Sequence, residues 1–310
     1  MTLPFFDCLN LPLVWLVHTV FAFVFGACIG SFLNVCIYRI PLDQSVVRPG
    51  SHCMSCGHAI AWWQNIPVLS YFLLRGKCHY CKASFSCRYA FVELLTAALF
   101  VLPLLALPPD RFISYGGSCT TFERVPQMPI LGLARLASPA MIPVLWVFVS
   151  GLVIATFVDF DHYIIPDSVS LGGIVAGLVL SCLVPEMHGQ QIWWRSLAAS
   201  AIGAAAGAGV LLAVAWLGRL AFRKDAMGMG DVKFLGAIGA FLGWKAVCFT
   251  LVAASFAGAL VGIVLIALGK GKLGSRLPFG PYLALGAFAW AFWGPPIYHA
   301  YLSLFLPPAI

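Results

Sequence analysis

Residues 140–167 read AMIPVLWVFVSGLVIATFVDFDHYIIPD, and this stretch decides what kind of protein the chain can form. It starts with an uncharged run, 140–158, and ends in a segment that holds three aspartates. An uncharged apolar run of about 20 residues is long enough to cross the hydrocarbon core of a bilayer as a helix. The stretch therefore predicts a transmembrane helix that ends in acidic groups close to one membrane surface.

The composition of the whole chain agrees with this stretch. Of the 310 residues, 61% are hydrophobic and only 9% are charged, and the mean hydropathy is +0.95. Soluble domains carry about 25% charged residues, and disordered chains carry many charges and few large apolar side chains. We therefore expect an all-α polytopic membrane protein that is surrounded by lipid. The net charge of +7 then encodes orientation in the membrane, and no nucleic-acid partner is expected.

About eight transmembrane helices are expected from the apolar runs. Of the 18 lysines and arginines, 13 fall in the loops on one side, and the positive-inside rule makes that side cytoplasmic. Both termini are then expected outside the cytoplasm. The apolar runs lie at 13–38, 88–109, 140–158, 168–185, 195–221, 232–244, 246–268 and 281–306, and the sixth is short and rich in glycine.

The spans and loops divide the chain into four expected parts. Small residues also recur at four-residue spacing, at Gly26 and Gly30 and at Gly203 and Gly207, which would let helices approach closely in lipid. The parts are a first transmembrane helix (1–38), a small cytoplasmic zinc-binding domain (39–87), a second transmembrane helix with an external loop (88–139) and the remaining transmembrane domain (140–310).

A cluster of cysteines assigns zinc to the loop 39–87. Two C-x2-C knuckles separated by roughly 20 residues are typical of a structural zinc site with four sulfur ligands. The alternative is disulfides or unpaired thiols, and the reducing cytoplasmic side disfavours disulfides. The neighbouring His52, His58 and His79 are expected to be solvated loop residues rather than ligands. The four expected zinc ligands are Cys53, Cys56, Cys78 and Cys81.

Acidic residues next to apolar helix point to catalysis. A carboxylate beside a membrane span is costly unless it has a partner or a function. Asp159 and Asp161 end the span at 140–158, and Asp231 begins the sixth span on the same expected face. Two neighbouring carboxylates share one proton, so that one can act as a general base and the other as a general acid. The residues alone favour Asp159 over Asp161 for the first position and leave both open.

Two further acids are expected to be structural. Asp167 follows Pro166 at the start of a span, where an aspartate caps a helix N-terminus. Glu93 enters the second span five residues after Arg88, and we expect it to pair with a basic group at the membrane interface.

Several motifs together resemble the type IV prepilin peptidases, which are aspartyl membrane proteases of the GxGD type. The segment 228–233 matches their G-x-G-D-x-K signature, and Asp159 followed by 165–167 matches D-x5-I-P-D. The segment 30–35 and the two cysteine knuckles are similar to the N-terminal module of that family. The segment 278–281 resembles the motif before its last span.

The resemblance implies a bifunctional enzyme of the bacterial inner membrane. It implies that the basic leader of type IV prepilins or type II secretion pseudopilins is cleaved on the cytoplasmic face by residues 140–310, the aspartyl peptidase domain. It also implies N-methylation of the new N-terminus with S-adenosylmethionine as the methyl donor. The implied site consists of the catalytic pair Asp159 and Asp231, the supporting residues Gly228, Gly230, Lys233, Pro278 and Gly280, and the four cysteines as zinc ligands.

Three other classes of protein compete with this interpretation. A presenilin-like intramembrane protease shares the Gly-x-Gly-Asp motif, but the cysteine module and the Ile-Pro-Asp context argue against it. A transporter should carry internal repeats and charges near the membrane midplane, and the sequence has neither. A zinc-dependent membrane adaptor would use the same acids only to cap helices.

Overall fold

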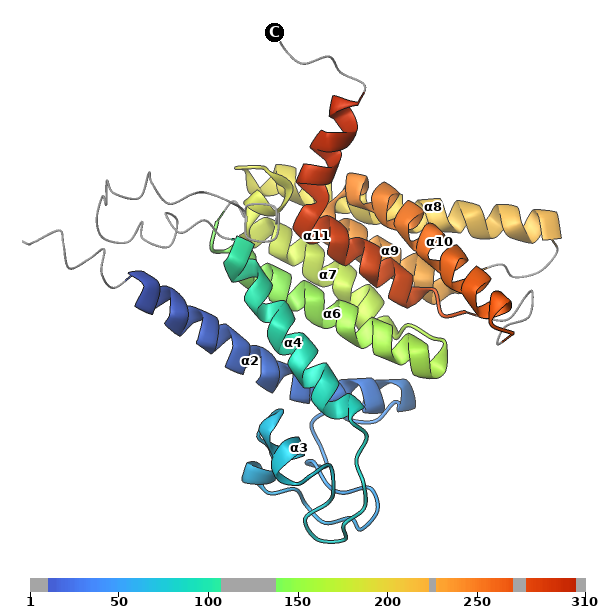
Figure 1. Ribbon diagram of the computed structural model, residues 1–310. Helices are drawn as coiled ribbons and strands as arrows, with labels where there is room; N and C mark the ends of the chain where they lie inside the picture. Colours follow the sequence, from blue (N-terminus) through green and yellow to red (C-terminus); the bar gives the residue numbers. More distant parts are fainter. Residues whose placement is uncertain (1–10, 107–137, 223–226, 270–276, 305–310) are drawn as a thin grey trace, which may run out of the picture. The chain divides into compact units, whose positions relative to one another are not determined.

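The computed structural model describes residues 11–106, 138–222, 227–269 and 277–304 (Figure 1). Across these ranges the chain is helical and contains no β-strand. Two isolated antiparallel bridges join His52 to Ala59 and Lys77 to Ser84. The expected all-α class is therefore confirmed for the described part of the chain.

Each expected apolar run corresponds to a helix in the structure, with ends that shift by a few residues. Shorter helical segments lie between them: η1 (Ile40–Leu42), η2 (Trp62–Asn65), α3 (Leu69–Leu73) and η5 (Pro185–His188). The helices that match the apolar runs are α2 (Leu11–Arg39), α4 (Arg88–Ala106), α6 (Met141–His162), α7 (Asp167–Leu183), α8 (Trp193–Phe222), α9 (Met229–Leu242), α10 (Trp244–Ala267) and α11 (Gly280–Ser303).

Among the described residues, five helices are long and apolar enough to cross a membrane, fewer than the eight that we expected. They correspond to α2, α4, α6, α8 and α10. Of the helices that match the apolar runs, the three that are not among these five are α7 with 17 residues, α9 with 14, and α11, which has 24 residues and contains Pro295 and Pro296. At 1.5 Å per residue α9 is only about 21 Å long, whereas the hydrocarbon core is about 30 Å thick. An apolar run predicts a helix well, but it does not by itself predict that the helix spans the bilayer.

The described residues fall into two compact units. The first contains α2, the short segments of residues 40–87, α4 and Leu145–Ile154 of α6. The second contains the start of α6 up to Val144, its end from Ala155 onward, and the helices α7 to α11. The cysteine knuckles therefore belong to the first unit, whereas Asp159 and Asp231 both belong to the second.

The first unit is built on a close pairing of α2 with α4. A Cβ atom added at Gly26 would lie 2.8 Å from the Cβ of Phe100, and one added at Gly30 would lie 2.7 Å from the Cα of Glu93. No side chain fits at such distances, so the expected packing role of both glycines is confirmed. The ring of Phe100 also stacks on that of Trp146, whose Nε1–H donates to the Phe100 carbonyl at 2.8 Å.

The second unit is organised around the short helix α9. This helix packs against α7, α8, α10 and α11, and nine of its 14 residues are buried (Figure 1). Gly203 and Gly207 of α8 face the backbone of α9 at Gly239 and Leu235, where a Cβ atom would overlap carbonyl oxygens. The expected close approach at the second glycine pair is thus also confirmed, and it fixes α9 along α8.

We expect Gly203→Leu to destabilise the protein, whereas Gly209→Leu on the same helix should have little effect. A side chain at position 203 meets the backbone of α9, but a Cβ atom at Gly209 has nothing within 4 Å. Overpacking of this kind costs about 1–3 kcal/mol or more. The measurement is the thermal unfolding temperature of both variants in detergent, and equal unfolding temperatures would contradict the packing described here.

Candidate functional site

Asp159 lies in the last turn of α6 and is 4% exposed. Its Oδ2 accepts a hydrogen bond from the backbone N–H of Gly280 at 2.8 Å. Gly280 is the first residue of α11, and the first N–H groups of a helix have no partner within their own helix. The positive end of the α11 dipole also favours a negative charge at this position. The N-terminus of α11 therefore holds the carboxylate of Asp159 in one orientation.

Asp231 lies in the first turn of α9, outside the five helices that could span a membrane. Gly228 is the N-cap of this helix, with extended backbone angles of φ −73° and ψ 140°. A Cβ atom at Gly228 would lie 3.3 Å from Oδ2 of Asp231, and one at Gly230 would lie 3.3 Å from Ile165. The two glycines of the motif thus leave open space beside the carboxylate and allow Ile165 to approach the helix.

The charge of Asp159 acts on Asp231. Burial and the neighbouring Asp159 charge together raise the pKa of Asp231 to about 7. Ile165 lies between the start of α9 and the start of α11, because it is close to both Gly230 and Gly280. A Cβ atom added at Gly280 would lie 3.1 Å from Ile165 Cδ1 and 2.8 Å from Asp159 Oδ2. This arrangement can hold one proton between two acids.

The structure distinguishes Asp159 from Asp161, which the sequence left open. Asp159 is buried, whereas Asp161 is exposed. The helix ends directly afterwards, because Tyr163 adopts a left-handed conformation with φ 56° and its N–H donates to the Asp159 carbonyl. Only Asp159 is therefore placed beside Gly280 and Ile165.

Asp167 does not cap α7, contrary to our expectation. Pro166 occupies the N-cap position, and Asp167 is the first residue of the helix, where its carboxylate points to another element. Lys233 Nζ lies 2.7 Å from Oδ1 of Asp167. The side chains are 30% and 62% exposed, so this pair adds at most about 1 kcal/mol to stability. It connects the starts of α7 and α9, which carry the two sequence motifs.

Glu93 is structural as expected, but the partners found for it are not basic groups. Its Oε2 accepts the backbone N–H of Val68 at 2.7 Å, and the carboxylate also accepts a hydrogen bond from Ser31. Gly30 brings α2 against Glu93, which places the Ser31 hydroxyl within reach. A local charge pattern could not indicate these partners, because both come from distant parts of the chain.

The four cysteine sulfurs form one cluster in the first unit. The Sγ atoms of Cys53, Cys56, Cys78 and Cys81 all lie within 4.8 Å of one another. The Sγ atoms of Cys53 and Cys81 are 3.8 Å apart, which is far too long for a disulfide. A tetrahedron with metal–sulfur bonds of about 2.3 Å has edges of about 3.8 Å. The cluster therefore fits a tetrahedral metal ion.

The two knuckles share one backbone geometry, which the sequence alone did not reveal. In the first, Cys53 N–H donates to the His58 carbonyl and Gly57 N–H donates to the Cys53 carbonyl. In the second, Cys78 and Lys82 make the corresponding bonds, and Gly57 and Lys82 both have positive φ, 70° and 60°. Backbone N–H groups of Cys56 and Ser55 lower the pKa of the Cys53 thiol to about 6, whereas burial and the neighbouring thiols raise the pKa of Cys56 to about 11.

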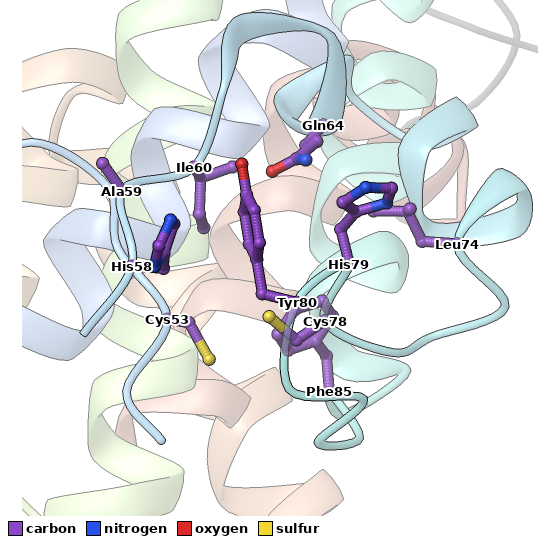
Figure 2. Close-up of a pocket in the computed structure, with 10 residues that line it drawn as sticks. All are labelled: Cys53, His58, Ala59, Ile60, Gln64, Leu74, Cys78, His79, Tyr80 and Phe85. Carbon is purple, nitrogen blue, oxygen red and sulfur yellow. The ribbon is translucent and has the colours of Figure 1, made fainter. Parts of the chain in front are cut away.

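Two of the histidines near the cysteines pack against aromatic rings. Figure 2 shows His58 beside Tyr80, and the centroids of these rings are 3.9 Å apart. The ring of His79 meets that of Trp63 edge to face at 5.3 Å. The pocket that they line with Cys53 and other residues has a volume of about 30 Å³, which suits a water molecule or two.

Comparisons with known proteins agree with the two-part organisation. Residues 24–107 match the model of the bacterial peptidase A24 N-terminal domain, and residues 146–263 match that of the type IV leader peptidase family. A protein of Aeromonas hydrophila named prepilin leader peptidase/N-methyltransferase is 36% identical over 318 residues, covering 95% of this chain and 97% of that one. The chain belongs to the type IV leader peptidase family.

Further relatives carry the same name. One of Pseudomonas putida is 32% identical over 305 residues, covering 91% of this chain and 93% of that one. One of Myxococcus xanthus is 39% identical over 257 residues, covering 83% of this chain but 65% of that one. No solved structure matches. In this member of the leader peptidase family, Gly280 donates a hydrogen bond to Asp159 but lies outside both ranges that match the family models. In the sequence, Gly280 was indicated by the motif at 278–281.

Proposed function

We propose that this protein cleaves the leader peptide of type IV prepilins or pseudopilins with Asp159 and Asp231 as an aspartyl pair. The observation that supports the proposal is the position of the two acids: Asp159 is held by the Gly280 N–H, and burial together with the Asp159 charge raises the pKa of Asp231 to about 7. The names of the relatives agree with this activity. When all eight apolar runs are taken as spans, 13 of the 18 basic residues fall on one side, which supports an inner-membrane protein whose active site faces the cytoplasm.

Cleavage follows from the two protonation states. Asp159, as carboxylate, takes a proton from water, whose oxygen attacks the scissile carbonyl carbon. Asp231, as carboxylic acid, gives its proton to the carbonyl oxygen, so the charge that develops there is neutralised. The tetrahedral gem-diol then breaks its C–N bond: the leaving amine takes the proton that Asp159 holds, and one hydroxyl of the gem-diol returns its proton to Asp231 as the new carboxyl group forms. One water is consumed, and the pair regains its single proton.

The open space beside Asp231 suits a peptide substrate. Gly228 is exposed and lacks a side chain at the point where Asp231 Oδ2 faces it. An extended backbone can approach closely only where no Cβ atom intervenes. We therefore assign Gly228 to the passage of the substrate backbone and Gly230 to the close contact of α9 with Ile165. We assign the pair of Lys233 with Asp167 to positioning the two motifs.

We further propose that the new amino terminus is N-methylated, in agreement with the second half of the relatives' names. S-adenosylmethionine supplies a methyl group to an amine when it is bound. The cavity of about 30 Å³ beside the cysteines is far too small for this molecule.

We propose that the cysteine cluster binds structural zinc. Four thiolates close the coordination sphere and leave no position for a reacting water. The segment between α2 and α4 is short of apolar core, so metal binding would supply much of its folding free energy. The role of Cys53, Cys56, Cys78 and Cys81 is then to hold this domain together rather than to react.

We expect Asp159→Asn and Asp231→Asn each to lower prepilin cleavage by about 10³-fold, because each removes one of the two proton-transfer groups. The matched control is Asp161→Asn, two residues away and exposed, which should cleave at the normal rate. The assay measures leader release from a synthetic prepilin by purified protein in detergent. Cleavage at the normal rate by either variant would reject the pair and leave Asp159 as a cap of α11.

The pH profile should show the raised pKa of Asp231. Because Asp231 must be protonated to donate, and its pKa is about 7, kcat/KM should fall as the pH rises through 7. It should also fall at low pH, where Asp159 becomes protonated and cannot act as a base. The measurement is kcat/KM between pH 4 and pH 9, with unfolding monitored in parallel, and a rise between pH 7 and pH 9 would contradict the assignment.

Removal of one cysteine ligand should release zinc. We expect Cys78→Ser to lose the single zinc ion per chain and to make residues 39–87 sensitive to protease, since three ligands hold the ion poorly. Cys87→Ser, an exposed cysteine outside the cluster, should retain both the ion and the resistance. Elemental analysis and limited proteolysis measure these properties, and zinc-free wild-type protein would refute the site.

A further inference from the structure

An exposed apolar surface lies on the cysteine-containing domain, apart from both candidate sites. Leu69, Phe72 and Leu73 of α3 are 59%, 68% and 74% exposed, and their spacing places them on one face of the helix. Trp62 of η2, which packs against α3, is 80% exposed. We call these four residues the α3 patch. Large apolar side chains gathered in this way mark an interaction surface.

The start of α3 is held at a defined depth along α4. Val68, the residue before α3, donates its N–H to the buried carboxylate of Glu93 at 2.7 Å. Glu93 lies five residues after Arg88, where α4 begins, which is about 7 Å along the helix axis. In a bilayer that α4 spans with Arg88 among the headgroups, this depth falls near the boundary between headgroups and acyl chains.

The backbone at Val68 is strained, which indicates that this placement is enforced. Val68 has φ 64° and ψ −54°, and Leu69 N–H donates to the Pro67 carbonyl at 2.6 Å. This is the rare γ-turn with positive φ, which is unfavourable for a β-branched residue. Such strain persists only where the surroundings hold it, and here the hydrogen bond to Glu93 does so.

Charges and aromatic residues near α3 match a lipid surface. Arg75 and Lys77 follow α3 directly and are exposed. Basic residues beside a membrane are attracted to anionic headgroups, and tryptophan is enriched at this level of the bilayer. Exposed apolar side chains also continue along α4, at Phe91 and Leu94, which are 55% and 48% exposed.

We propose that the α3 patch inserts into the leaflet surface, with its apolar side chains among acyl chains and Arg75 and Lys77 at anionic headgroups. The domain is then anchored to the bilayer at α3 as well as at α2 and α4. Lipid fits this surface better than a prepilin leader, because the basic leader of the proposed substrate would meet the like charges of Arg75 and Lys77. A second copy of the chain would meet the same two charges.

The test places a photo-crosslinking amino acid at Phe72, Leu73 or Met54 in the full-length protein. Met54 is the matched control, since it is 66% exposed in the same domain but lies between two metal-cluster cysteines. The proteins are reconstituted in liposomes of phosphatidylethanolamine and phosphatidylglycerol and irradiated, and mass spectrometry measures lipid adducts. We expect several-fold more lipid adduct at positions 72 and 73 than at 54.

A second variant tests the charges and separates misfolding from loss of lipid contact. Arg75→Glu combined with Lys77→Glu should reduce the adduct at position 72 in anionic liposomes but not in phosphatidylcholine liposomes, while the metal content stays unchanged. Equal lipid adduct at positions 54 and 72 would overturn the proposal. So would crosslinks at positions 72 and 73 that go mainly to a second copy of the chain or to added prepilin.

Discussion

The hydrogen bond from the Gly280 N–H to the buried carboxylate of Asp159 is the constraint on which the candidate site depends. A carboxylate in apolar surroundings is costly unless donors compensate the lost water. The first turn of a helix offers such donors without any side chain. Residue 280 must therefore be small, because a Cβ atom there would lie 2.8 Å from the carboxylate oxygen that the N–H binds. The start of α11 and the end of α6 are thus fixed to one another.

The second acid depends on a different constraint, the short length of α9. Asp231 can lie beside Asp159 only if the start of α9 stays at the level where α6 ends. The backbone contacts of Gly203 with Gly239, and of Gly207 with Leu235, fix the position of α9 along α8. A helix that is enclosed on several sides does not need to cross the membrane to be stable. Glycines far from the acids in sequence therefore determine where Asp231 lies.

The sequence predicted the features that arise from local patterns. The helices follow the apolar runs, the glycine pairs lie at close helix contacts, and the cysteine spacing gave the cluster of four sulfurs. The failures concern partners that only the folded chain brings together. Asp167 looked like a cap but pairs with Lys233, and Glu93 receives its donors from Val68 and Ser31. Whether α7 and α9 span the bilayer likewise depends on the helices around them.

Glu93 and Asp159 show how the surroundings decide what a buried acid does. Both lie in apolar helices, are at most 9% exposed and accept a backbone N–H. Glu93 has a hydroxyl as its second donor, and neither of these two donors titrates. The charge of Asp159 instead acts on a second acid, Asp231, and in our proposal these two acids share one proton and exchange it with the substrate. A carboxylate satisfied by fixed donors stabilises structure, whereas one that faces a second acid is prepared for proton transfer.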